Sequence, residues 1–493
     1  MLHLLLLLNY YSPLLVALAF LVVTPSPSLG FSPDAPAIRQ PAIRSNDDTF
    51  VILGGTGRIG TAVASHLLLR APKSRIILVG RDDERGTRAV SEVLGENPSV
   101  GDDGDDGDDS DNVSFRKADW RNDDELRSVI GGCTCLIHTA GPFLEEKPTP
   151  LRAAIDSGCR AYVDVSDPLD YLELSLAMSR DAEESGLTAV LAAGAFPGMS
   201  NVMAVEAASL CRENGGEGAG VRDTRFNYFT AGLGGSGDVN LYITNLGFGE
   251  PMAQYQGGGL RLYEALSGLL LGKISFYLSD AEWTQKSPVG FGNDEARARV
   301  GEQTVFAWPF PEAATVPAEL GASGESSAAM GTAPDVWNDM LGILVALVPR
   351  KLWRSKRFSQ FLADFSQPLV KATDFLLKLT SPGEVGETHA MRVDVTGTDG
   401  SAVSVVQAHE SFRRCVGQSC AEFALDLLEH PSPGVQLPEQ RYRNDDARRR
   451  IIKQLTSTPG TFAYTGPVAV SSAAPPSKLD QALLKANEAE IKQ

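Results

Sequence analysis

The sequence predicts an α/β fold built around a parallel β-sheet, followed by a second domain. Short apolar runs alternate with stretches whose apolar residues recur at helical spacing between residues 49 and 205. Strands separated by short helices favour a parallel sheet with helices on both faces. The chain has 493 residues, which exceeds one ordinary domain, so we expect two domains with appendages.

The expected strands of the sheet are short and bounded by turn residues. They cover residues 50–53, 75–79, 113–117, 160–165 and 187–192, with a further strand inside 135–143. Helices are expected at residues 57–69 and 83–94, and a third closes at 126–130. The acidic run within residues 101–112 lacks the ligand spacing of a calcium loop and repels itself, which predicts a disordered surface insertion.

A glycine-rich turn joins the first expected strand to the first expected helix. Its residues are Gly55, Thr56, Gly57, Arg58, Ile59 and Gly60, in the pattern G-x-G-x-x-G. Glycines without Cβ atoms let a pyrophosphate approach the backbone, and the helix N-terminus supplies free N–H donors. Because the pattern lies inside a βαβ unit of about 30 residues, it predicts a Rossmann-type dinucleotide-binding domain.

The end of the second strand predicts which dinucleotide binds. Arg81 follows this strand, and an arginine there accommodates the 2′-phosphate of NADP, whereas an acidic residue would bind the ribose of NAD. Asp82 follows directly, so NAD stays the less favoured alternative. Asp119, after the third strand, is a candidate for the adenine side, or else a plain turn aspartate.

The ends of the fourth and fifth strands supply the remaining candidates. Ala140, Gly141 and Pro142 are expected beside the nicotinamide ribose, at the carboxyl edge where a dinucleotide crosses the sheet. His138 is a candidate catalytic base, although a histidine at a strand end is often simply packed. Asp164 is a candidate proton-handling or substrate-orienting group, or else a helix cap. No tyrosine of the chain is followed by a lysine four residues later, which excludes the classical short-chain dehydrogenase mechanism.

Three segments resemble the saccharopine dehydrogenase and reductase family, and most closely its branch in plastid-bearing organisms. They are residues 153–204, TAGPF at residues 139–143 and SPGVQLPE at residues 432–439. The resemblance implies a Rossmann-type first domain, an inserted second α/β (α+β) domain and a C-terminal helix that returns to the first domain. It places these parts at residues 49–205, 206–410 and 411–465, with a flexible tail at 466–493. Residues 223–231 read as a strand of the second domain, and residues 391–409 as a hairpin.

The family's chemistry implies hydride transfer between a nicotinamide and a C=N or C=O group of a small molecule. The family loop that carries Asp-Pro-Gly followed by Asp-His reads Phe-Pro-Gly-Met-Ser-Asn in this chain. The resemblance places the substrate region at this loop, with Phe196, Pro197, Gly198, Ser200 and Asn201. Its changed polar positions argue against the saccharopine-specific reaction. The alternative is a dinucleotide-binding scaffold or redox sensor without turnover.

The first 48 residues are typical of targeting segments. Residues 1–30 read as a signal peptide with an apolar run of ten residues, and residues 31–48 have the composition of a transit peptide. The combination predicts import into a plastid, with secretion or an endomembrane location as alternatives. Six cysteines without a C-x-x-C pair favour a reducing compartment and no metal site.

The net charge and one apolar, cationic segment indicate which kinds of binding partner to expect. The net charge of −18 argues against a nucleic-acid partner. Residues 340–357 combine nine apolar with five cationic residues around Trp353, which favours peripheral contact with a membrane surface or, alternatively, a buried helix pair with a basic face. We also expect an oligomer, with a dimer as the expected form.

Overall fold

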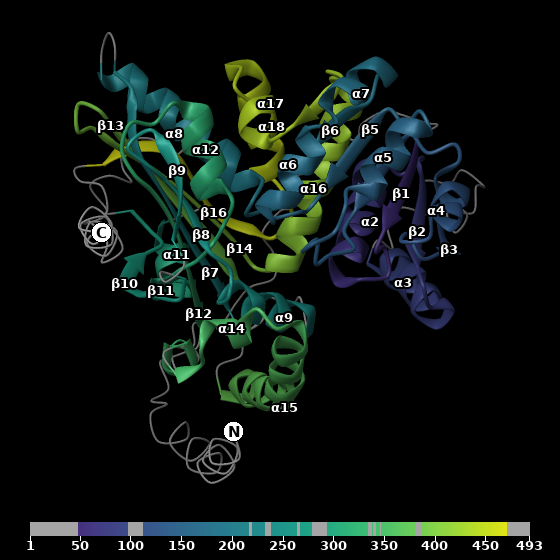
Figure 1. Cartoon of the computed structure of the whole chain (residues 1–493), viewed down its shortest axis with the longest axis horizontal. Helices are drawn as coiled ribbons and strands as arrows, with labels where there is room; N and C mark the ends of the chain where they lie inside the picture. Colours follow the sequence, from purple (N-terminus) through teal and green to yellow (C-terminus); the bar gives the residue numbers. More distant parts are fainter. Residues whose placement is uncertain are drawn as a thin grey trace.

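The computed structural model describes most of the chain between Asp48 and Val470. The described residues are 48–96, 112–215, 219–231, 238–263, 267–278, 293–333, 338, 342–345, 347–380 and 387–470. The predicted presequence and acidic insertion lie almost entirely outside them, so both stay predictions, as does the plastid location. Two seven-stranded sheets lie side by side, one in each half of the molecule (Figure 1).

The first sheet is parallel throughout, with the strand order β15-β6-β5-β4-β1-β2-β3. Its strands are β1 (Thr49–Leu53), β2 (Arg75–Gly80), β3 (Val113–Lys117), β4 (Cys135–His138), β5 (Ala161–Asp164), β6 (Thr188–Val190) and β15 (Gly434–Gln436). Helices α2 (Arg58–Arg70), α3 (Asp83–Gly95), α4 (Asp123–Ile130), α5 (Thr149–Asp156), α6 (Leu169–Leu176) and α7 (Ser179–Ser185) connect the first six strands. The predicted Rossmann-type sheet is therefore confirmed. The strand order reverses between β1 and β4, which is where such sheets bind ligands.

The second sheet is mixed, with the order β10-β11-β12-β7-β13-β14-β16. Its strands are β7 (Val221–Ala231), β10 (Leu270–Ser275), β11 (Glu302–Ala307), β12 (Ser326–Ala333), β13 (His389–Gly397), β14 (Ala402–His409) and β16 (Thr461–Val470); β8 (Met252–Gln256) and β9 (Gly259–Tyr263) form a separate ribbon. The predicted strand at 223–231 and the predicted hairpin are thus present as β7 and β13–β14. Helices α8 (Met199–Gly215), α9 (Asp238–Gly247), α11 (Asn293–Arg299), α12 (Glu312–Leu320), α14 (Arg350–Trp353) and α15 (Lys356–Thr380) belong to this half.

Two expected boundaries differ from the structure. Helix α8 continues through residue 205, because its residues on both sides of that point are buried in the same core. Strand β16 extends to Val470 and pairs with β14, so the first five residues assigned to the tail belong to the second sheet.

Helix α16 (Phe412–Glu429) is the returning helix and lies between the two sheets (Figure 1). Gly417 lets it approach α2, since a Cβ there would lie 2.6 Å from the Cβ of Ala62. Its Glu422 carboxylate accepts hydrogen bonds from Arg70 Nε at 2.7 Å and contacts His66 Nε2 at 2.7 Å, all in a buried site. Burial alone would raise the pKa of Glu422, but the contacts with His66 and Arg70 hold it below its usual value.

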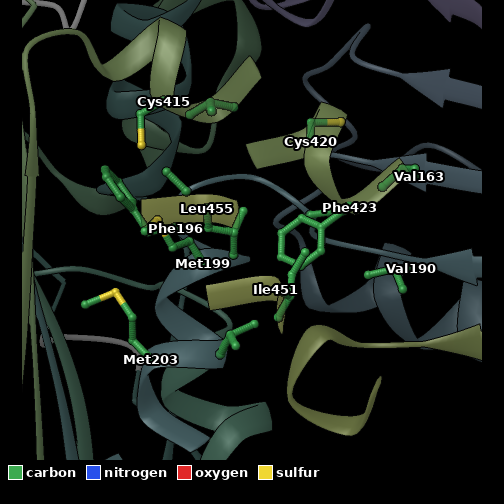
Figure 2. Close-up of a cluster of buried hydrophobic side chains, with 14 of the residues drawn as sticks. Val163, Val190, Phe196, Met199, Met203, Cys415, Cys420, Phe423, Ile451 and Leu455 are labelled. Carbon is green, nitrogen blue, oxygen red and sulfur yellow. The ribbon is translucent and has the colours of Figure 1, made fainter. Parts of the chain in front are cut away.

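A single apolar core continues from the first sheet into the second half through α16. Figure 2 shows Phe423 of α16 beside Val163 and Val190 of the first sheet, and near Met199 of α8. Ile451, from α18 (Asp445–Thr456), closes this cluster. The short helix α17 (Pro438–Arg441) follows β15. In the part of the chain that the structure describes, no helix is long and apolar enough to cross a bilayer.

The α16–α2 contact predicts a large stability effect at Glu422. Replacing this residue by alanine (Glu422→Ala) removes the carboxylate that Arg70 and His66 share in a buried site. Loss of one member of a buried ion pair costs about 3 to 5 kcal/mol of unfolding free energy. Urea denaturation should show this loss, while the control Glu429→Ala, at the exposed end of the same helix, should stay close to wild type. Equal effects of the two substitutions would contradict the assignment.

Candidate active site

A cavity of about 670 Å³ lies between the two halves of the molecule. One end is formed by the glycine turn and the carboxyl ends of β2, β3 and β4. The other end is formed by the loop before α8, by α16 and by residues of the second half. We call it the interdomain cavity.

The glycine turn is built for close approach of a ligand. Gly54 has a φ of +79°, and a Cβ on Gly60 would lie 2.4 Å from the carbonyl oxygen of Gly54. Gly57 is the N-cap of α2, and no side chain caps the helix there. No capping side chain therefore occupies the N-terminus of α2, where helices bind anions such as a pyrophosphate.

The residues that follow β2 place one acidic side chain, Asp82, and two basic side chains, Arg81 and Arg85, in the cavity lining. The carboxylate of Asp82 caps α3, since it accepts a hydrogen bond from Arg85 N at 2.8 Å. Arg81 and Arg85 have exposed side chains and line the cavity. Arg58 and Arg121 line it as well. Four guanidinium groups at one end suit a phosphate-rich ligand, and Arg81 is placed as a 2′-phosphate partner should be.

Most of the predicted cofactor residues line the interdomain cavity. They are Thr56, Gly57, Arg58, Ile59, Gly60, Arg81, Ala140, Gly141 and Pro142. Gly55 and Asp119 are not part of the lining. Gly55 supports the turn from behind, with its N–H near the carbonyl oxygens of Ile52 and Val79 at 3.1 Å each. Asp119 instead accepts a hydrogen bond from Arg121 N at 3.1 Å, which makes it a turn residue.

The two candidate catalytic residues lie outside the cavity lining. The ring of His138 is fully buried between Trp120 and Phe143, with ring centroids 4.9 and 4.8 Å away. Burial, assisted by Arg121, lowers the pKa of His138 to about 3, so the ring is neutral. Asp164 is also fully buried, and it accepts hydrogen bonds from Ser166 Oγ at 2.6 Å and Ala192 N at 2.9 Å. These contacts give Asp164 a role in holding the loops after β5 and β6.

The predicted substrate loop divides into two parts. Phe196 and Pro197 line the interdomain cavity, whereas Gly198, Ser200 and Asn201 do not. Asn201 is buried, and its Oδ1 accepts a hydrogen bond from Gly198 N at 2.9 Å. Its Nδ2 donates to Glu439 Oε2 at 2.8 Å. Asn201 therefore fixes the loop against the segment that carries the family-like SPGVQLPE sequence.

Asp167 is the site residue that the sequence interpretation missed. It lies three residues beyond the end of β5, is half-buried and lines the cavity. Burial raises the pKa of its carboxyl group to about 7. A carboxyl group with such a pKa is a candidate general acid or base near neutral pH. The sequence feature that could have identified Asp167 is its position immediately before Pro168, shortly after the end of the strand that contains Asp164.

An aromatic wall was missed as well. It lines the same cavity as Asp167 and comprises the aromatic residues Phe196, Trp308, Phe310 and Phe412 together with Met330. Phe196 stacks on Phe412 with a centroid distance of 4.9 Å, and Phe310 meets Phe196 edge-on at 5.6 Å. Apart from Phe196, these residues come from parts of the sequence with no recognisable motif.

Comparisons with known proteins agree with this geometry. Residues 50–190 match the family model described as the saccharopine dehydrogenase NADP binding domain. Over its length the chain is similar to apo saccharopine dehydrogenase (L-Glu forming) from Saccharomyces cerevisiae. The identity is 11%, the TM-score is 0.52, and the match covers 86% of this chain and 100% of the yeast chain. The chain therefore contains a segment that matches this NADP-binding domain, and it shares the fold of the yeast enzyme.

Two further solved structures have lower TM-scores and cover a smaller share of the chain. A short-chain type dehydrogenase/reductase from Mycobacterium ulcerans has 16% identity and a TM-score of 0.24, covering 29% of this chain and 66% of its own. A short-chain dehydrogenase/reductase from Veillonella parvula in complex with NADP has 17% identity and a TM-score of 0.21, covering 29% and 67%. No curated protein matches the chain. The matched domain is an NADP-binding domain, and the preference for NADP over NAD stays a prediction.

The preference for NADP is tested at Arg81. Removing its guanidinium (Arg81→Ala) deletes a charge-assisted contact to a 2′-phosphate, which corresponds to about a 10- to 100-fold weaker Kd. We expect this loss for NADPH and a change of less than about twofold for NADH, measured by fluorescence titration. The control Arg88→Ala changes an exposed arginine of α3 that pairs with Glu84 outside the cavity lining. An equal loss for both nucleotides would contradict the role of Arg81.

Proposed function

We propose that this protein is an NADP-dependent oxidoreductase of saccharopine dehydrogenase-like type that acts on a C=N or C=O carbon. The observation that carries the proposal is the continuity of one cavity. It joins a glycine turn suited to a dinucleotide, a carboxyl group with a pKa near neutrality and an apolar wall able to exclude water. NADPH, when bound, would supply the hydride for such a reduction.

The protein's own residues then have separate tasks. The glycine turn and the arginines around it bind the phosphates. Asp167 borders the cavity three residues beyond β5, and in this proposal it transfers its proton to the nitrogen or oxygen of the substrate. The aromatic wall excludes water from this end, which strengthens electrostatic interactions there. The alternative is a scaffold or sensor without turnover. It does not explain why a carboxyl group with a raised pKa lines the cavity.

Asp167 has a defined pH signature under this proposal. Below pH 7 its carboxyl group is protonated and can donate, so reduction should fall as the pH rises through about 7. We expect Asp167→Asn to lower kcat about 100-fold and to abolish this pH dependence, with the Kd for NADPH unchanged. Following NADPH oxidation at 340 nm with a panel of carbonyl and cyclic imine compounds provides the measurement.

The matched control for this substitution is Asp170→Asn, three residues further on. Asp170 is exposed and lies outside the cavity lining. Equal kcat values for wild type and Asp167→Asn would refute the assignment of Asp167. No turnover by the wild type with any compound of the panel would favour the scaffold alternative.

We also propose peripheral contact between the helical arm α14–α15 and an anionic bilayer. The arm carries several exposed large apolar side chains, namely Leu352 (44% exposed), Phe361 (53%) and Phe365 (57%), and Ile343 and Leu347 before it are also exposed. It extends away from both sheets (Figure 1). Lys351 and Arg357 are exposed cations on the same segment. Apolar side chains next to cations are typical of interfacial helices.

The structure changes which residues should be tested for membrane contact. Trp353 is buried against Phe248, and Arg354 Nε donates to the carbonyl oxygen of Gly249 at 2.7 Å, so both serve the fold. The double substitution Phe361→Ser and Phe365→Ser should instead reduce co-sedimentation with phosphatidylserine-containing liposomes at low salt by at least about tenfold. Leu174→Ser, an exposed leucine on α6, is the control. Wild-type protein that stays in the supernatant would rule out the contact.

A further inference from the structure

Resting on the function proposed above, we infer that the substrate of the interdomain cavity is an uncharged compound with a flat, apolar body next to its carbonyl or imine group. The aromatic wall would hold this body, and Asp167 would face the reacting polar atom. Amino acids and other substrates with free carboxylates would be excluded.

The shape of the wall favours a flat ligand. Phe196 stacks with two rings, since the ring centroid of Tyr228 lies 4.2 Å away at an interplanar angle of 10° and that of Phe412 lies 4.9 Å away at 26°. Phe310 meets both Phe196 and Tyr228 edge-on, at angles of 86° and 88°. These mutual contacts fix the ring planes, so the wall is rigid before a ligand arrives. Rigid aromatic surfaces bind flat apolar groups by stacking and edge contacts.

The distribution of charge excludes anionic substrates. All four arginines of the cavity lining come from the glycine turn, the β2 end and the β3 end. Among the described lining residues beyond that end, Asp167 is the single charged group, and Thr139 and Thr244 are the hydroxyl-bearing ones. A substrate carboxylate placed there would be buried without a cation. A buried charge without a partner is strongly unfavourable, and the ionised form of Asp167 would repel a substrate carboxylate.

The residues behind the wall add to this exclusion. Tyr228 OH donates a hydrogen bond to Glu312, which is fully buried in the second half. Burial raises the pKa of Glu312 to about 8, although the hydrogen bond from Tyr228 opposes the shift. Glu439, also fully buried, binds Asn201 of the substrate loop. Both groups described behind the wall are therefore acids, and neither could bind a substrate carboxylate.

A matched pair of probes tests the inference by binding, independently of turnover. The probes are 4-methylbenzaldehyde and 4-carboxybenzaldehyde, which share size and reactive group and differ in one charge. Isothermal titration of the full chain loaded with NADP⁺, which cannot reduce an aldehyde, should show at least about tenfold tighter binding of the methyl compound. Equal binding of both, tighter binding of the carboxylate, or binding of neither would overturn the inference.

A cation added to the wall provides the second arm. Met330→Lys places an ammonium group on β12 within the lining, and it should reduce or reverse the preference for the uncharged probe by at least about tenfold. Phe412→Lys serves the same purpose from α16 if the first variant is not folded by circular dichroism. An unchanged preference in a folded variant would overturn the inference, since the wall would then not be the binding surface.

The binding arms separate this inference from the proposed function. Discrimination between the probes without NADPH oxidation by any compound would leave the substrate class standing and refute the oxidoreductase. NADPH oxidation that is faster with 4-carboxybenzaldehyde than with 4-methylbenzaldehyde would leave the oxidoreductase standing and refute the substrate class.

Discussion

The packing of α16 between the two sheets is the constraint on which the cavity depends. Its first turn places Phe412 and Val416 in the cavity lining. Its next turns meet α2, where Gly417 allows close approach and Glu422 binds Arg70. Because α2 begins at the glycine turn, one helix sets the distance between the phosphate-binding end and the aromatic end. Substitutions along this contact would therefore affect both stability and the geometry of the cavity.

Each half of the molecule contributes one chemical property to the cavity. The first sheet brings the turn and the arginines, and their charge suits phosphates. The second half brings Trp308, Phe310 and Met330, whose apolar surfaces exclude water. Neither property alone defines an oxidoreductase. A reducible substrate has to contact the nicotinamide in a site that excludes solvent. The interdomain cavity combines the two properties, because residues of both halves line it.

The sequence predicted the parts of the fold and site whose meaning is local. The glycine turn, β2 and Arg81 fall within one βαβ unit, so their relation follows from the geometry of that unit. The aromatic wall could not be predicted, because Met330 reaches it through the pairing of β12 with β7, a strand about a hundred residues earlier. Strand β15 was missed for a related reason. Its three residues pair only with β6, far away in the sequence, and carry no periodic pattern of their own.

Asp164 and Asp167 show why residue type and position did not suffice to find the acid. Burial raises the pKa of both carboxyl groups. Asp164, however, receives hydrogen bonds from Ser166, Ala192 and Tyr162, which occupy its oxygens and partly oppose the shift. Asp167 has no such set of donors among the described residues and borders the cavity. A carboxyl group that is fully bonded to the protein stabilises loops, whereas one that faces a cavity can exchange a proton with what binds there. The two aspartates are three residues apart. Asp164 is the last residue of β5 and is buried, whereas Asp167 follows the strand and lines the cavity.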